Sequence, residues 1–174
     1  MWKNNTLYFG SNLTADAFAR MDEKKKLKEF LKRVEESFLV PAEIIDQKKD
    51  EALGFASILL SCSAVEALAK IYFPNEASSS KRFNKFCLEN IGIRRNIFEK
   101  MCIYDAYRCG IAHEGRIKRR FAVSYQIDNA FWENGVDHIL NPLVFRRTFL
   151  QDIQKHFRGS EMHFGEIVKN LFED

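Results

Sequence analysis

Several sequence features that mark common functional classes are missing from this chain of 174 residues. It has no glycine-rich loop of the kind that cradles nucleotide phosphates, no internal repeat and no low-complexity tract. It also lacks the paired short cysteine spacings, such as C-x2-C, that are typical of zinc sites. These absences argue against a nucleotide-binding α/β fold, a repeat protein and a structural zinc domain.

Neither the start of the chain nor its net charge points to a particular functional class. The first 18 residues lack a basic start followed by an apolar run, the pattern of a secretory signal. The four cysteines lie in apolar helical patterns, where a free thiol acts as a small hydrophobe. We therefore expect a reducing, cytoplasmic setting. The net charge of +3 favours anionic partners only slightly, because Lys and Arg are spread along the chain.

One apolar stretch, Ala52 to Ala69, is long enough that a membrane-spanning helix has to be considered. Its 18 residues contain a single charge, Glu66, and 18 residues is near the minimum length of a spanning helix. However, the stretch also holds three serines and a glycine, and charged residues flank it. A helix that is apolar on all sides is also what the centre of a bundle requires. We expect a buried core helix and no membrane span.

Apolar periodicity predicts a mainly helical chain. The length and the 46% hydrophobic content suit one domain, 1–174, with an irregular segment at 1–13. Pro41 is expected to end the first helix and to begin the second. The expected helices are Thr14 or Asp16 to about Leu39, Ala42 to Tyr72, Phe83 to Glu89, Arg94 to Gly110, one that starts at Asn141-Pro142, and Glu161 to Phe172.

The pattern changes between 117 and 140. "RFAVSYQI" (120–127) is rich in β-branched and aromatic residues, and Asn134-Gly135 separates two short apolar runs, which is a strong hairpin signal. The predicted fold is therefore all-α in the main, a bundle of four to six helices with a short β-hairpin insertion around 120–140.

The stretch "YDAYRCGIAHEGRIKRR" (104–120) carries the chemistry of interest. Arg108 and His113 are five residues apart, which on a straight α-helix turns their side chains about 140° from each other. They can still border one groove if the helix loosens near Gly110. A neutral His can take the proton of a ribose 2′-hydroxyl, and an Arg fork can stabilise charge on phosphorane oxygens. This chemistry needs no metal and no cofactor, so neither is expected.

These residues and their helical context resemble the HEPN superfamily of small helical-bundle proteins. The hallmark of that superfamily is an Arg, four to six residues and then a His at the end of a late helix, and Arg108 to His113 fits the four-residue spacing. "SAVEALAKIYF" (63–73) resembles the second long helix of the family, where an acidic residue often points toward the site; Glu66 stands there. The order of the predicted helices is also similar.

The resemblance implies a homodimer that brings two motifs into one cleft, with RNA as the substrate. Active members resemble endoribonucleases, many of them toxins or defence effectors, and an antitoxin-like or nucleotidyltransferase partner is a further implication. Other members serve as inactive binding modules. Active members usually carry a polar residue directly after the Arg, and Cys109 at that place favours an inactive module that binds RNA or a partner protein.

The basic run after the motif has two interpretations. Its residues can grip phosphates beside the motif, or they can form a solvated turn that leads into the hairpin. Phe121 and Tyr125 can likewise stack on bases or face the core. The candidate nucleic-acid-binding residues are Arg116, Lys118, Arg119 and Arg120.

The motif residues also have structural interpretations. Arg108 can interact with a helix C-terminus or pair with Asp105, and Glu66 can pair with Lys70 or Arg108. Two further alternatives place chemistry on cysteine. Cys109 can act as a nucleophile activated by the His four residues on. A metal can also bind the stripe formed by Cys102, Cys109 and His113, although no fourth ligand is evident.

Overall fold

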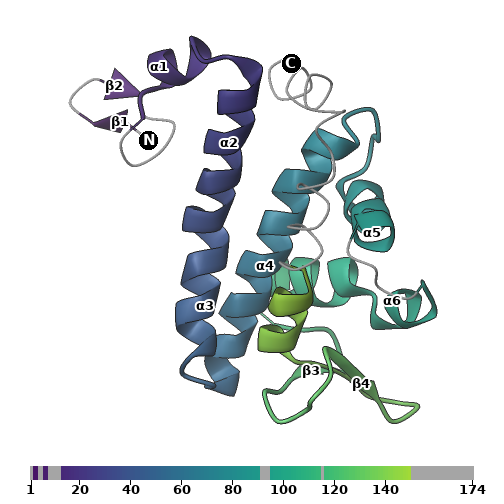
Figure 1. The fold of residues 1–174 in the computed structure, drawn as a ribbon. Coiled ribbons are helices and arrows are strands. Elements are labelled where there is room, and N and C mark those ends of the chain that lie inside the picture. The colour runs from purple at the N-terminus through teal and green to yellow at the C-terminus, as the bar shows by residue number, and fades with distance from the viewer. Residues whose placement is uncertain (1, 4–5, 8–12, 91–94, 115, 150–174) are drawn as a thin grey trace.

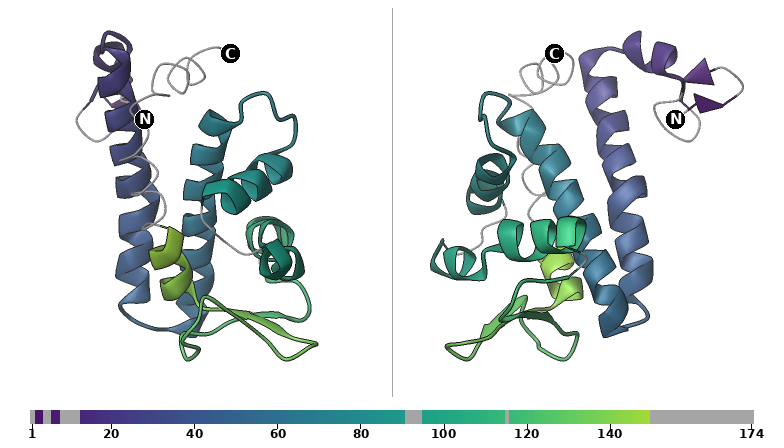
Figure 2. Two further views of the ribbon diagram at one scale, coloured as in Figure 1. Left: turned by 45° about the vertical axis from the view of Figure 1, so that its right-hand side comes forward. Right: turned by 180° about the vertical axis from the view of Figure 1, so that it is seen from behind.

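The computed structural model describes residues 2–3, 6–7, 13–90, 95–114 and 116–149. Over these residues the chain is mainly helical with a small sheet, which confirms the predicted class (Figure 1). Two long helical segments lie side by side and antiparallel; the later elements lie along the second segment, and the short N-terminal elements lie beyond the start of the first (Figures 1 and 2). The first segment comprises α2 Glu23–Val34, η1 Glu35–Leu39 and α3 Val40–Asp46, and the second is α4 Glu51–Tyr72.

Apolar residues recur along the first long segment at three- and four-residue spacing, and Leu27 and Val34 in this pattern are buried. Its start differs from the prediction, because the helix expected from Thr14 is interrupted at 20–22. Thr14 instead caps a short helix, α1 (Ala15–Ala19), and Asp22 caps α2 by accepting a hydrogen bond from the Lys25 N–H. Two-residue strands, β1 Trp2–Lys3 and β2 Thr6–Leu7, precede them and pair antiparallel.

The prediction that Pro41 ends the first helix is wrong. The helix continues through it, with helical dihedral angles at both Leu39 and Val40. The turn just before the proline, η1, is a π-helix with i→i+5 hydrogen bonds. Proline lacks an N–H and clashes with the carbonyl four residues earlier, and a widened turn accommodates both effects without ending the helix.

The predicted second helix, 42–72, is wrong in its first part. Residues 42–46 belong to α3, and the chain then reverses through a turn in which Lys49 has a φ of +49°. Asp50 begins α4 by accepting a hydrogen bond from the Ala52 N–H at 2.9 Å. The polar run before α4 is therefore a turn with a cap and not the solvated face of one long helix.

By length and composition alone, α4 could cross a membrane. Its most apolar window has a mean hydropathy of 1.8, and half of that window is buried inside the fold. Core helices of soluble proteins share both properties. The expectation that the chain does not span a membrane stays a prediction.

The next two predicted helices also have different bounds. α5 (Ser79–Asn90) starts four residues earlier than expected, and the Ser78 hydroxyl accepts a hydrogen bond from the Lys81 N–H, as the serine-rich loop predicts. The helix expected over 94–110 is divided into α6 (Arg95–Met101) and η2 (Tyr104–Glu114). The division falls at Cys102, whose φ of +43° ends α6 although no glycine marks the position.

The sheet confirms the predicted hairpin, and its third strand comes from the β-branched and aromatic run at 120–127. β4 and β5 pair antiparallel around Asn134-Gly135, where the Asn134 side-chain oxygen accepts two backbone N–H groups and Gly135 has a φ of +85°. β3 pairs parallel with β5, so β5 is the central strand. The strands are β3 Phe121–Val123, β4 Phe131–Glu133 and β5 His138–Leu140.

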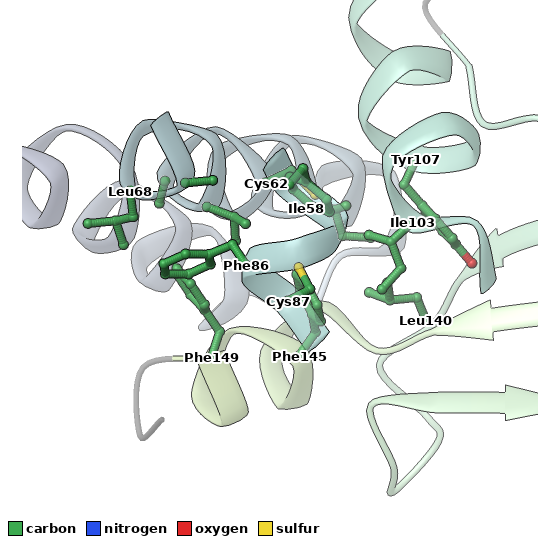
Figure 3. Packing of buried hydrophobic residues seen from close by; sticks show 14 of the residues in the cluster. Ile58, Cys62, Leu68, Phe86, Cys87, Ile103, Tyr107, Leu140, Phe145 and Phe149 are labelled. Atoms are coloured by element: carbon green, nitrogen blue, oxygen red, sulfur yellow. The ribbon is translucent and has the colours of Figure 1, made fainter. Parts of the chain in front are cut away.

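A helix over 142–149 follows, as the Asn141-Pro142 signal predicts. The Asn141 side chain accepts a hydrogen bond from the Val144 N–H at 3.2 Å. Phe145 and Phe149 are fully buried and pack into the main core beside α4 and α5 (Figure 3). The predicted helix over 161–172 lies outside the described residues.

A buried ion pair joins this last helix to α3. The Arg146 Nε donates to the Asp46 Oδ2 at 2.8 Å, and both side chains are almost fully buried. The Tyr125 hydroxyl donates to the other Asp46 oxygen at 2.9 Å. Burial, followed by the hydrogen bond to Asp46, raises the pKa of Tyr125, so the phenol keeps the proton that it donates. Three segments far apart in the sequence are therefore tied to one carboxylate.

Candidate active site around Arg108 and His113

Arg108 and His113 lie together because η2 is a π-helix. In a helix with i→i+5 hydrogen bonds, a residue five positions on returns to nearly the same face. The Arg108 Nη1 and the His113 Nε2 are 3.4 Å apart. The two side chains that a straight α-helix would turn apart are thus neighbours, as the loosening expected near Gly110 requires.

Gly110 lets the following loop fold back onto η2. A Cβ at this position would lie 2.7 Å from the Arg116 carbonyl oxygen, closer than real Cβ atoms approach backbone. The Gly110 carbonyl accepts the Arg116 N–H at 3.3 Å, and the Ala106 carbonyl accepts the Lys118 N–H at 3.3 Å. Contact between loop and helix, and not an unusual φ, therefore requires glycine here.

Tyr107 fixes η2 against the sheet. Its ring is fully buried, and its hydroxyl lies 3.1 Å from the Ala122 carbonyl and 3.3 Å from the His138 carbonyl. It contacts β3 and β5 together, so the motif helix and the strands after it hold each other in place. The next residue along, Arg108, is the one that turns toward α4.

Glu66 on α4 holds Arg108. The Arg108 Nε donates to the Glu66 Oε2 at 2.6 Å, and the Tyr104 hydroxyl donates to the Glu66 Oε1 at 3.2 Å. The Arg108 and Glu66 side chains are each about one-fifth exposed, at 23% and 21%. One carboxylate therefore orients the guanidinium through its Nε and leaves both terminal nitrogens of Arg108 free of that carboxylate.

The surroundings of Arg108 and Tyr104 raise the pKa of both side chains. Burial alone would lower the pKa of Arg108, but the hydrogen bond and the charge of Glu66 outweigh burial and raise it. Burial raises the pKa of Tyr104, and the Glu66 charge adds to the effect. Near neutral pH the arginine is thus a cation, and the tyrosine is a proton-bearing donor to Glu66.

His113 is exposed, so a substrate can reach it. A guanidinium only donates hydrogen bonds, so a hydrogen bond between these atoms requires the neutral His113 tautomer that accepts at Nε2 and carries its proton on Nδ1. That tautomer has the form of a general base. At 3.4 Å the contact is long, so another donor, such as a hydroxyl, can replace Arg108 at the Nε2 lone pair.

The structure decides between the ion pairs that sequence spacing allows for Asp105 and Glu66. Asp105, which can pair with Arg108 by sequence spacing, instead binds Lys118 through both carboxylate oxygens at 2.7 Å. Lys70, four residues after Glu66, forms no ion pair with it, and Glu66 pairs with Arg108. The predicted trio of Arg108, His113 and Glu66 is therefore brought together.

The cysteine-based alternatives gain no support from the geometry. Cys102 lies in the break before η2, where its thiol donates to the Glu99 carbonyl, so it does not share a helical face with His113. Among the described residues no group of three His, Cys, Asp or Glu side chains is placed to hold a metal. Cys109 is half-buried beside the motif.

The side chains of the basic run are less available to bind phosphate than the sequence indicates, because two of them are paired with carboxylates. Lys118 binds Asp105, and this hydrogen bond raises the pKa of Lys118. Arg116 lies 3.4 Å from Glu114. Arg119 and Arg120 are exposed and make no side-chain ion pair within the described part of the chain. The two candidate base-stacking rings are half-buried: Phe121 packs on Tyr107 and His138, and Tyr125 binds Asp46.

Two features of the site were missed by the sequence analysis. The first is Tyr104, which was not singled out, although its position four residues before Arg108 could have placed it beside that side chain. The second is a groove next to Glu66, where Lys70 lies one helical turn on and Arg82 comes from α5. No local pattern could have joined Arg82 to this place, because the loop between α4 and α5 sets its position.

Comparison of the chain with models of known protein families, with curated proteins and with solved structures found no match.

Proposed function

We propose that this chain is a metal-independent endoribonuclease of the HEPN type. One observation supports it above all: a π-helix holds the cation Arg108 within 3.4 Å of an exposed His113, while Glu66 on another helix orients the arginine. The combination provides a base, a fixed cation and access from solvent. A bundle of HEPN type, with the hairpin as an insertion, is part of the same proposal.

The proposed reaction is an internal transfer at phosphorus. His113 takes the proton of a ribose 2′-hydroxyl, and the resulting oxygen attacks the neighbouring phosphorus. The bond from phosphorus to the 5′-oxygen breaks, a 2′,3′-cyclic phosphate remains on one product, and the departing 5′-oxygen takes up a proton. Positioned general bases contribute about 10²- to 10⁴-fold to such reactions.

Arg108 stabilises the negative charge that develops on the phosphate during the reaction. The two terminal guanidinium nitrogens are not bound by Glu66, and they can donate to the two non-bridging oxygens as charge grows there. Glu66 fixes the plane of the guanidinium, and Tyr104 fixes Glu66. Because the cation is already oriented, little reorganisation is required when the charge develops.

The proposal includes a homodimer in which two copies of the Arg108–His113 pair share one cleft. A second histidine in that cleft is a natural donor of the proton that the leaving oxygen needs. An antitoxin-like or nucleotidyltransferase partner would cover the same cleft, and a cytoplasmic location suits an RNA substrate.

A second candidate is a module that binds RNA or a partner protein through the same cleft without cutting RNA. Cys109 favours it, because active HEPN-like proteins usually have a polar residue after the Arg. The half-buried thiol cannot replace such a residue as a strong hydrogen-bond donor.

The deciding experiment is incubation of a mixed, end-labelled single-stranded RNA with the purified protein in EDTA, beside the same sequences as 2′-O-methyl RNA. We expect cleavage of the unmodified RNA in the chelator and none of the 2′-O-methyl strand, because the attacking hydroxyl is blocked. Binding of both strands with cleavage of neither would support the binding module. Cleavage of both strands would exclude the proposed reaction.

A further inference from the structure

A groove adjoins the candidate active site at Glu66. It has a volume of about 280 Å³ and is lined by Glu66, Ala67, Lys70, Ser79 and Arg82. Glu66 belongs to both places, with its carboxylate turned to Arg108 on the site side. The groove is therefore the neighbouring recess for a chain molecule that is bound at Arg108 and His113.

The groove carries unused positive charge. Lys70 is exposed and makes no ion pair within the described part of the chain. Arg82 is half-buried, and its guanidinium donates to the Glu76 carbonyl and, at 3.2 Å, to the Ser79 hydroxyl. The arginine is thus held in one place, with further N–H groups left over from its five. The only acidic lining residue, Glu66, is already compensated by Arg108.

The spacing suits successive phosphates of one strand. Lys70 follows Glu66 by one helical turn, about 6 Å along the axis of α4. Because Arg108 binds Glu66, a phosphate held at Arg108 lies about one helical turn from the Lys70 position on α4. The recess at the site, where Glu66 and Arg108 are about one-fifth exposed, favours a flexible single strand over a rigid duplex.

We propose that this groove, through Lys70 and Arg82, binds a backbone phosphate of single-stranded RNA next to the phosphate held at Arg108 and His113. The proposal rests on the proposed ribonuclease function and specifies its substrate path: the strand runs along α4 toward the start of α5. The basic run after the motif is then at most a second contact, since two of its four cations are paired with carboxylates.

The test measures binding and cleavage separately. Binding of a fluorescent 2′-O-methyl single-stranded RNA, which the proposed reaction cannot cut, is followed by anisotropy over a series of KCl concentrations. Each lost phosphate contact lowers the slope of log affinity against log salt by about 0.7 for a single strand. We expect Lys70→Ala to lower the slope by about 0.7 and to weaken binding about fivefold, with a larger loss for Lys70→Glu.

The matched control is Lys28→Ala, which removes another exposed lysine, on α2, that makes no ion pair within the described residues. It should leave both slope and affinity as in the wild type. Arg82 is a less clean target, because its side chain also holds the loop before α5. Lys70→Ala removes only an exposed ammonium group and should fold normally, as a thermal melt would check.

The outcomes separate the two proposals. A Lys70→Ala protein that matches wild type and Lys28→Ala in slope, affinity and KM, while wild type cleaves RNA, would overturn the groove and leave the ribonuclease standing. A reduced slope together with no cleavage by wild type would support the groove and remove the nuclease. A wild type that does not bind the modified strand at all would overturn the groove proposal.

Discussion

Replacing His113 by alanine is expected to lower the rate of RNA cleavage in EDTA by about 10²- to 10⁴-fold, the usual contribution of a positioned general base. The side chain is exposed, so its removal leaves no cavity and should hardly change the stability. Arg108→Ala is expected to have a similar effect on rate, because it removes the cation that meets the developing charge. Single-turnover rates with a labelled oligonucleotide measure both losses.

The matched control for His113→Ala is Glu114→Ala. Glu114 is the next residue, is also exposed, and lies outside the contacts that join Glu66, Arg108 and His113. Its replacement should leave the rate near that of wild type. Equal activity of wild type and His113→Ala, with a thermal melt that shows both folded, would remove His113 from the chemistry. A contaminating nuclease would give the same rate in every variant.

The second large effect concerns stability. Asp46→Ala is expected to lower the free energy of unfolding by about 3–5 kcal/mol, because it leaves the Arg146 charge buried without its partner. The Arg146 side chain is only 4% exposed, and the Tyr125 hydroxyl loses its acceptor as well. Against a typical total of about 5–15 kcal/mol, such a loss is large. Urea unfolding followed by circular dichroism measures it.

Two variants check the reason for this loss. Glu43→Ala removes a carboxylate that lies 3.9 Å from Arg146 and is 54% exposed, so it should cost about 1 kcal/mol or less. Asp46→Leu combined with Arg146→Met removes both charges and should be more stable than Asp46→Ala alone. A cost for Asp46→Ala as small as that for Glu43→Ala would show that the buried pair does not hold α3 to the 142–149 helix.

The helical class and the hairpin could be predicted because their signals are local. Asn134-Gly135 specifies the turn between β4 and β5, and Asn141 followed by a proline specifies the start of the 142–149 helix. The predicted helix bounds are wrong where the local sequence is compatible with more than one backbone conformation. Pro41 is a usual helix boundary, yet a π-turn lets the helix pass through it. Cys102 carries no signal for the left-handed conformation that it adopts.

Some members of the candidate site could be named from the sequence, but its geometry could not. Arg108 and His113 could be chosen by residue type and spacing, and Glu66 only through the resemblance of its helix to that of a known family. The π-helix that brings the first two together depends on the loop packing against Gly110 and on Tyr107 bound to the sheet, which are contacts made only in the folded chain. The groove with Lys70 and Arg82 joins residues of α4 and α5, so no single window of sequence contains it.

The most direct test of the central claim is the chemistry of the product ends. Single-stranded RNA cut by the wild-type protein in EDTA is analysed by mass spectrometry, with the Arg108→Ala protein beside it. The account predicts a 2′,3′-cyclic phosphate on the upstream product and a 5′-hydroxyl on the downstream one, and loss of both products with Arg108→Ala. Ends that carry a 3′-hydroxyl and a 5′-phosphate would contradict it, since they require attack by water and not by the neighbouring 2′-hydroxyl.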